Sequence, residues 1–256
     1  MTDIPRSGDH APEPSKGSPS PSPSPPDGPY PSGVTRPPVI AIDGPSGSGK
    51  STVARAVAAR LGLRYLDTGA MYRALTWWAR QRGLDLSDTE AIAQAARDLP
   101  VTLGTDPDSP SIAVDGVDVS QAIRETEISE SVSAVATNLA VRQEMVRRQQ
   151  QIIASGGWVA EGRDITTVVA PDAQVRVLLL ARESERLARR ARDVHGTANQ
   201  AAVDATRDQV VRRDAQDSTV AQFTEAASGV SVIDSSDLTV DETVDAVLAL
   251  LPWRPR

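Results

Sequence analysis

Residues 44–52 of this 256-residue chain read Gly-Pro-Ser-Gly-Ser-Gly-Lys-Ser-Thr. The run fits the pattern of a phosphate-binding loop, or P-loop, in which a glycine and four residues precede Gly-Lys-Ser/Thr. An apolar stretch at 38–43 precedes it, as a buried parallel strand would, and helix-like sequence at 52–61 follows. Inward-facing N–H groups and the helix dipole make such a loop an anion site. We therefore expect the chain to bind a nucleotide.

Within this loop, Lys50 supplies a mobile cation for the outer phosphates, and the Ser51 hydroxyl is placed to ligate Mg²⁺. We expect Lys50 to be catalytic and Ser51 to be the metal ligand. The predicted ATP-binding residues of the loop are Gly44, Pro45, Ser46, Gly47, Ser48, Gly49, Lys50, Ser51 and Thr52.

Apolar runs at 175–180 and 230–233, and shorter ones at 65–66 and 158–160, read as further strands. Helix-like sequence at 183–194, 198–214 and 240–251 lies between or after them. Strands that alternate with helices predict an α/β fold, with a parallel sheet covered by helices on both faces.

The pattern changes between about 84 and 130. A helix-like stretch at 89–98 is followed by short, partly alternating runs, and Asp115-Gly116 supplies a turn signal between two of them. This favours a small, mostly antiparallel insert, followed by a long helix over 138–154.

The ends and composition set the domain limits. Residues 1–37 are rich in Pro and Ser and predict a disordered tail, whereas 38–256 are long enough to form one domain with a real core. The chain has no cysteine, no apolar run near the ~18 residues of a membrane helix and no apolar signal-peptide core. We expect a cytoplasmic monomer with no membrane partner.

Charge bears on the partners. The net charge of −7 argues against a nucleic-acid binder, which is usually basic. Arginines nevertheless cluster at 142–148, 182–192 and 207–213, which suits a small anionic substrate in a cleft. Solvated helix faces are the alternative for most of them.

Two short segments suggest a second substrate site. Thr68 is a good N-cap for a helix beginning near Gly69, which places Arg73 about one turn in, where it could grip a phosphate. Arg163 and Asp164 follow the strand candidate at 158–160, and ligands gather beyond the carboxyl ends of parallel strands. A surface arginine and a surface ion pair in a turn are the competing interpretations.

The runs at 42–50, 66–73 and 162–169, with 114–120 followed by Ile123-Arg124, closely resemble bacterial cytidylate kinases. The similarity extends from about residue 38 to about 251. It implies a P-loop kinase with a nucleoside-monophosphate-binding insert at about 84–130 and a helical lid at about 182–222. It also implies ATP-dependent phosphorylation of CMP and dCMP to CDP and dCDP in pyrimidine nucleotide metabolism, with Mg²⁺ and with ATP as co-substrate.

The resemblance also implies roles for single residues. The positions at which the family reads cytosine are occupied here by Ser133, Arg142 and Asp164. Those near the acceptor phosphate are occupied by Thr68, Arg73 and Arg163, and a further phosphate-binding arginine corresponds to Arg213. The carboxylate that contacts the sugar corresponds to Asp217. Lys50, Arg163 and Arg213 are the expected catalytic residues, and Arg189 and Arg190 are expected to close over ATP. The chemistry agrees, because a carboxylate accepts the N4 hydrogen of cytosine while Arg and Ser donate to N3 or O2.

One position departs from the family pattern. Val220 stands where the family usually has an arginine, and Arg212, Arg213 or a lid arginine could compensate. A kinase acting on UMP, AMP or a non-nucleotide, and a nucleotide-binding protein without turnover, both remain open at this stage.

Overall fold

The computed structural model describes residues 36–253. The predicted tail at 1–37 thus lies almost wholly outside the described residues. The strands are β1 (Val39–Asp43), β2 (Arg64–Asp67), β3 (Val101–Leu103), β4 (Ile112–Val114), β5 (Val117–Asp118), β6 (Trp158–Gly162), β7 (Val175–Leu180) and β8 (Ser231–Asp234). The helices are α1 (Lys50–Leu61), α2 (Thr68–Gln81), α3 (Thr89–Asp98), α4 (Thr126–Ala136), α5 (Leu139–Ile153), α6 (Glu183–His195), α7 (Gln200–Asp217) and α8 (Val240–Leu248), with short turns η1 (Ala122–Arg124) and η2 (Ile165–Val169).

Five strands form the main sheet in the order β2-β6-β1-β7-β8, and all of their pairings are parallel. β1 lies in the centre, with β6 and then β2 on one side and β7 and then β8 on the other. The loops after β1, β2 and β6 therefore meet at one edge of the sheet, where α/β proteins bind ligands. The predicted parallel sheet is confirmed.

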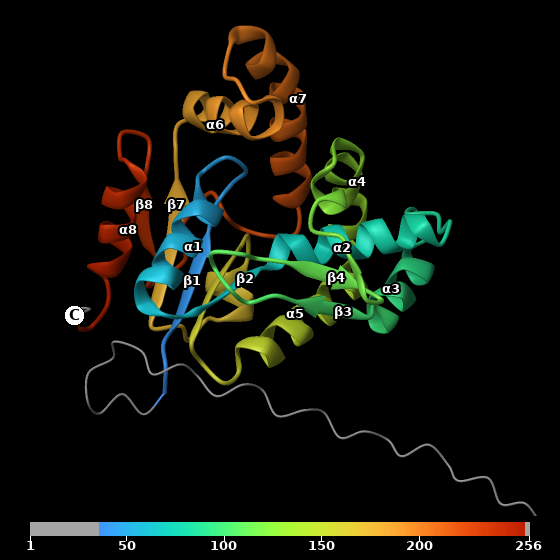
Figure 1. The fold of residues 1–256 in the computed structure, drawn as a ribbon, viewed down its shortest axis with the longest axis horizontal. Helices are drawn as coiled ribbons and strands as arrows, with labels where there is room; N and C mark the ends of the chain where they lie inside the picture. The colour runs from blue at the N-terminus through green and yellow to red at the C-terminus, as the bar shows by residue number, and fades with distance from the viewer. Residues whose placement is uncertain (1–35, 254–256) are drawn as a thin grey trace, which may run out of the picture.

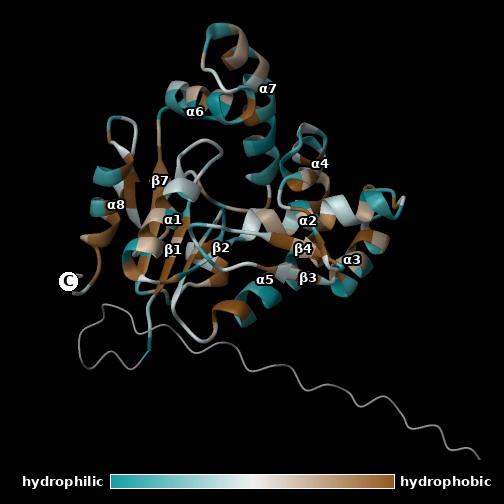
Figure 2. Cartoon of the chain, viewed as in Figure 1, coloured by the Kyte–Doolittle hydropathy of each residue, from teal (hydrophilic) through white to brown (hydrophobic). Residues whose placement is uncertain are grey.

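Helices cover both faces of this sheet, because alternate residues of its strands point to opposite sides. Ile40 and Ile42 of β1 pack with α1 and α8, whereas Ala41 between them faces the side covered by α2 and α5. Hydrophobic residues concentrate along the central strands and the helix faces turned to them (Figure 2).

The insert contains a second sheet, β3-β4-β5, which is antiparallel as predicted. Asp115 and Gly116 form its hairpin turn with φ of 52° and 76°, a conformation that Asp and Gly tolerate well. The insert lies beside α2, α3 and α4 on one side of the main sheet (Figure 1).

Helices α6 and α7 lie over the edge of the sheet from which α1 begins (Figure 1). They occupy the segment expected to be the lid. The helix predicted at 198–214 runs from Gln200 to Asp217, whereas the one predicted at 240–251 ends at Leu248.

Candidate active site

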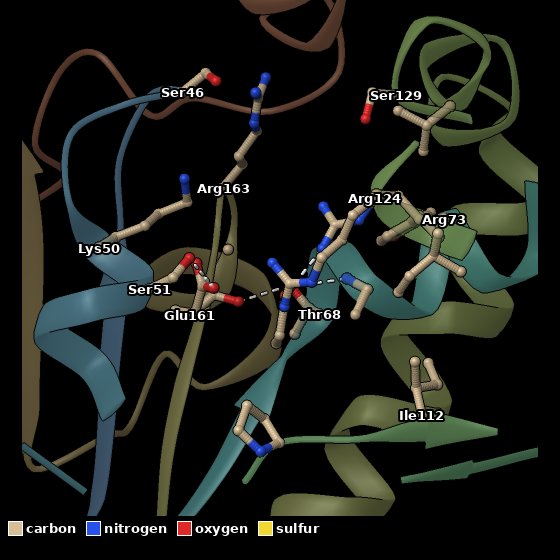
Figure 3. Close-up of a pocket in the computed structure, with 18 of the residues that line it drawn as sticks. Ser46, Lys50, Ser51, Thr68, Arg73, Ile112, Arg124, Ser129, Glu161 and Arg163 are labelled. Atoms are coloured by element: carbon tan, nitrogen blue, oxygen red, sulfur yellow. Dashed lines mark hydrogen bonds and ion pairs between the residues drawn. The ribbon is translucent and has the colours of Figure 1, made fainter. Parts of the chain in front are cut away.

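A cavity of about 720 Å³ opens at the carboxyl edge of the main sheet. The P-loop, the ends of β2 and β6, the insert and helices α6 and α7 contribute to its lining. Figure 3 shows Lys50 and Ser51 on one side and Arg73 and Arg124 on the other, with Arg163 extending between them. The arrangement offers two adjoining regions, one at the P-loop and one toward the insert.

Lys50 opens α1 directly after Gly49, whose φ of 90° is readily adopted only by glycine. Its ammonium group donates a hydrogen bond to the carbonyl of Pro45 at 3.3 Å. Burial lowers the pKa of Lys50, and the nearby carboxylate of Glu161 opposes that effect. The ammonium group therefore lies in a poorly hydrated site where an added phosphate would stabilise its charge.

Ser51 faces a carboxylate that the sequence had not singled out as functional. Its hydroxyl donates to Glu161 Oε1 at 2.6 Å, and the Tyr65 hydroxyl donates to the same oxygen at 3.0 Å. Burial, together with the charge of Asp67, raises the pKa of Glu161. A hydroxyl and a carboxylate at the cavity wall are the hard oxygen donors that Mg²⁺ prefers, so these residues fit that ion.

The start of α2 differs from the prediction. Asp67, not Thr68, is the N-cap, because its carboxylate accepts the Ala70 N–H at 2.8 Å. The Thr68 hydroxyl instead donates to the carbonyl of Glu161 at 2.8 Å and ties α2 to β6. Asp67 also pairs with Arg73 at 2.9 Å. Burial by itself would raise the pKa of Asp67, but Arg73 and the Ala70 N–H hold it below its usual value.

Arg163 follows β6, and its side chain contacts α7. Its guanidinium pairs with Asp214 at 3.1 Å and also with Asp217, and lies 4.6 Å from the ring centre of Phe223. Both carboxylates belong to α7, so this helix holds the arginine in place. The stacked ring restricts the guanidinium further.

The residues expected to read the base lie beside this arginine. Asp164 forms an ion pair with Arg142 of α5, and both line the cavity. Burial raises the pKa of Asp164 and the charge of Arg142 opposes this. The Ser133 hydroxyl donates to Asp217 Oδ1 at 3.1 Å and is buried behind the cavity wall. The Asp164–Arg142 pair offers a hydrogen-bond acceptor beside donors, which is the combination that recognition of cytosine requires.

Several cations at the cavity face one another. Burial and the charges of Arg163 and Arg73 lower the pKa of Arg213 to about 9. Burial also lowers the pKa of Arg190, with Arg73 and Arg124 adding to that effect and Asp193 opposing it. Guanidinium groups that repel one another in a partly buried space favour a ligand with several negative charges.

The structure brings most of the predicted site residues together. The cavity is lined by Ser46, Gly47, Gly49, Lys50, Ser51, Thr52, Thr68, Arg73, Arg142, Arg163, Asp164, Arg190, Arg213 and Asp217. Among the described residues that line it, Gly44, Pro45, Ser48, Ser133 and Arg189 do not appear.

The side chains of Arg189 and Arg190, which were predicted to act together, have different surroundings. Arg189 donates to the carbonyl of Ser48 at 3.1 Å and to the carbonyl of Ser235 at 2.7 Å, so it supports the P-loop from outside the cavity. Arg190 lines the cavity itself. Their predicted roles toward ATP stay predictions.

Sequence reasoning missed Glu161, Asp67 and Asp214 as members of this network. Glu161 stands one residue before Gly162-Arg163-Asp164, and Asp214 lies inside an arginine-rich helix, but neither belongs to a motif that assigns it a partner. Arg124, which closes η1 and lines the cavity, had served only as a marker of the insert.

A sequence profile described as Cytidylate kinase matches residues 40–252. The chain is 44% identical over 217 residues to a cytidylate kinase of Streptomyces avermitilis, covering 83% of this chain and 92% of that protein. It is 47% identical over 220 residues to a cytidylate kinase of Cutibacterium acnes, covering 85% and 97%. A shikimate kinase from Acinetobacter baumannii in complex with shikimate aligns with a TM-score of 0.39 and 19% identity, covering 84% of this chain and 92% of that one.

Proposed function

The chain belongs to the cytidylate kinase family, and we propose that it transfers the terminal phosphoryl group of ATP to CMP and dCMP. The observation that carries this proposal is that the P-loop and the residues expected to bind the acceptor line the same cavity. The P-loop with Lys50 and the Asp164–Arg142 pair line one continuous cavity, to which Arg163 also contributes. A kinase needs its donor and its acceptor held side by side, since positioning supplies much of the rate.

We assign the donor side to the P-loop. Its backbone and Lys50 would hold the phosphate chain of ATP, while Ser51 and Glu161 would hold Mg²⁺ directly or through water. The metal would help to neutralise the negative charge of the phosphates. Lys50 would stay protonated there, because the phosphates offset the burial that lowers its pKa.

We assign the acceptor side to the region toward the insert. Arg73, Arg163 and Arg213 would bind the phosphate of the monophosphate. Its negative charge would offset the repulsion between these arginines. Asp164 would accept the N4 hydrogen of cytosine and Arg142 would donate to the ring, while Asp217, held by Ser133, would contact the sugar. Uracil presents a carbonyl in place of the N4 amine, so Asp164 would lose the hydrogen bond that it accepts from the base.

The partners in this proposal are ATP, CMP and dCMP. No helix among residues 36–253 is long and apolar enough to cross a bilayer. The cytoplasmic location, the monomeric state and the absence of a nucleic-acid partner stay predictions from the sequence.

Release of ADP across the common nucleoside monophosphates tests this function. The purified protein with ATP and Mg²⁺ is expected to release ADP rapidly with CMP or dCMP, and at a small fraction of that rate with UMP, AMP or GMP. Equal rates with UMP and CMP would contradict the base assignment. ATP binding without release of ADP under any condition would contradict the kinase assignment.

A further inference from the structure

A carboxylate of the lid helix α7 contacts the backbone of the P-loop. The backbone N–H of Ser46 donates to Asp214 Oδ1 at 3.1 Å, although the two residues lie 168 positions apart in the sequence. Asp214 stands three residues before the end of α7, on its last turn. The contact joins the loop to a helix from a distant part of the sequence.

Arg186 of the other lid helix completes a closed ring of hydrogen bonds. Its Nη1 donates to Asp214 Oδ2 at 2.5 Å and to the carbonyl of Ser46 at 2.9 Å. Both backbone groups of Ser46 are therefore engaged by the lid. The side chains of Arg186 and Asp214 are each only 14% exposed, so water competes weakly for these bonds.

Gly47 allows this close approach. A Cβ at that position would lie 2.4 Å from the backbone carbonyl oxygen of Arg186, and its φ is 77°. The backbone of α6 thus rests directly on the loop. Any shift of Arg186 would be transmitted to the loop without an intervening side chain.

The same carboxylate also holds the arginine on the acceptor side. Asp214 Oδ1 lies 3.1 Å from a guanidinium nitrogen of Arg163, which projects into the cavity from the end of β6. One side chain therefore contacts the P-loop, the lid and the residue between the two substrate sites. Charge-assisted hydrogen bonds of this kind are short and directional, so they fix orientation as well as distance.

We propose that Asp214 is a positioning residue that latches the α6–α7 lid to the P-loop and aims Arg163 at the transferred phosphoryl group. The proposal rests on the proposed function for its reaction. Asp214 acts through Arg186 and Ser46 on the donor side and through Arg163 on the acceptor side. It neither contacts the base nor replaces Lys50, so its loss is expected to lower kcat more than it raises KM for CMP.

Two substitutions separate its contacts. Asp214→Asn keeps an oxygen for the Ser46 N–H but loses the charge that holds both arginines, whereas Asp214→Ala loses every contact. We expect kcat to fall about tenfold in Asp214→Asn and about 100-fold in Asp214→Ala, with KM for CMP changing less than about threefold. Asp208→Asn is the matched control, because Asp208 lies on the same helix and is exposed. Its kinetics should equal those of the wild type.

Hydrogen exchange supplies a readout that does not depend on turnover. In Asp214→Asn the amides of α6 and α7 should exchange faster than in the Asp208→Asn control, while those of the central sheet stay unchanged. Unchanged lid exchange would overturn the latch even if kcat fell. If the wild type fails to phosphorylate CMP but lid exchange still depends on Asp214, the proposed function fails and the latch stands.

A double-mutant cycle tests whether Asp214 acts through Arg186. Arg186→Ala combined with Asp214→Ala should lower kcat little further than Asp214→Ala alone, because both remove one shared interaction. Fully additive losses would contradict the latch, as would wild-type kcat in Asp214→Ala.

Discussion

The hydroxyl of Ser51 donates to the carboxylate of Glu161 across 2.6 Å and ties the first turn of α1 to the end of β6. The two residues are separated by 110 positions in the sequence. The bond places an alcohol and an acid side by side at the wall of the cavity, on the P-loop side. It is the structural basis for assigning the metal to this position.

Replacing Glu161 by Gln is expected to raise the Mg²⁺ concentration that gives half-maximal activity by about tenfold or more, since residues that hold or orient a metal ligand typically contribute 10- to 100-fold to affinity. A Mg²⁺ titration at saturating ATP and CMP measures it. Tyr65→Phe is the matched control, because it removes the other donor to Glu161 and leaves the carboxylate. An unchanged Mg²⁺ requirement in Glu161→Gln would remove Glu161 from the metal site.

Replacing Asp164 by Asn is expected to impair CMP more than UMP. The carboxylate accepts the N4 hydrogen, whereas an amide can present either a donor or an acceptor. Loss of one charge-assisted bond of about 1.5–3 kcal/mol would lower kcat/KM for CMP by about 10- to 150-fold. Steady-state kinetics with both nucleotides decide the matter. Equal losses for CMP and UMP would show that Asp164 serves only to hold Arg142.

Position 220 tests the departure from the family pattern. Val220 is half-buried in the turn after α7, and its neighbour Ala221 lines the cavity. Arg212, suggested as a substitute, is exposed and does not appear among the described residues of the lining. Val220→Arg is expected to raise kcat/KM for CMP by up to about tenfold with an unchanged melting temperature, since it would add one phosphate contact.

Val211→Arg is the control for that variant, because it adds the same charge at an exposed position of α7. A fall in both activity and melting temperature in Val220→Arg would mean that the side chain points into an apolar region, where an unpaired charge is destabilising. Such a result would mean that position 220 does not correspond to the phosphate-binding arginine of the family.

The stability of the domain should carry a pH signature from Glu144 on α5. Its carboxylate accepts hydrogen bonds from Arg147 at 2.6 and 2.8 Å and from Arg148 at 2.7 Å, which lower its pKa to about 2. A folded-state pKa below the unfolded value gives stability that is present above about 4.5 and lost as the pH falls toward 2.

Glu144→Gln should therefore reduce the free energy of unfolding by about 0.5–1 kcal/mol at pH 7, the small value reflecting the exposure of Arg147. The difference from the wild type should shrink as the pH falls below 4. Urea unfolding at pH 7, 5 and 3.5 measures it, with exposed Glu130→Gln as the control. A difference that does not change with pH would assign the effect to packing.

Local sequence signals were sufficient for the elements that carry the site. The apolar run before Gly44 became β1, and Asp115-Gly116 became the hairpin turn, because each depends on residues close in the chain. The prediction of Thr68 as the N-cap was wrong. Asp67, directly before it, can accept the same backbone N–H groups, and sequence alone does not show which of the two residues caps the helix. The contacts of Asp214 and Glu161 were out of reach, because they depend on how distant segments meet in the fold.

Transfer of a labelled phosphoryl group is the most direct test of the assigned reaction. The wild-type protein is incubated with ATP labelled at the γ-phosphate, Mg²⁺ and CMP, and the label is followed by chromatography. We predict that it appears in CDP in equal amount to the ADP formed. Lys50→Ala should lower that rate by about 10²-fold or more while the protein stays folded, and Arg60→Ala, an exposed change on the same helix, should not. Label that is released as free phosphate, or that stays in ATP while CMP is bound, would contradict the account.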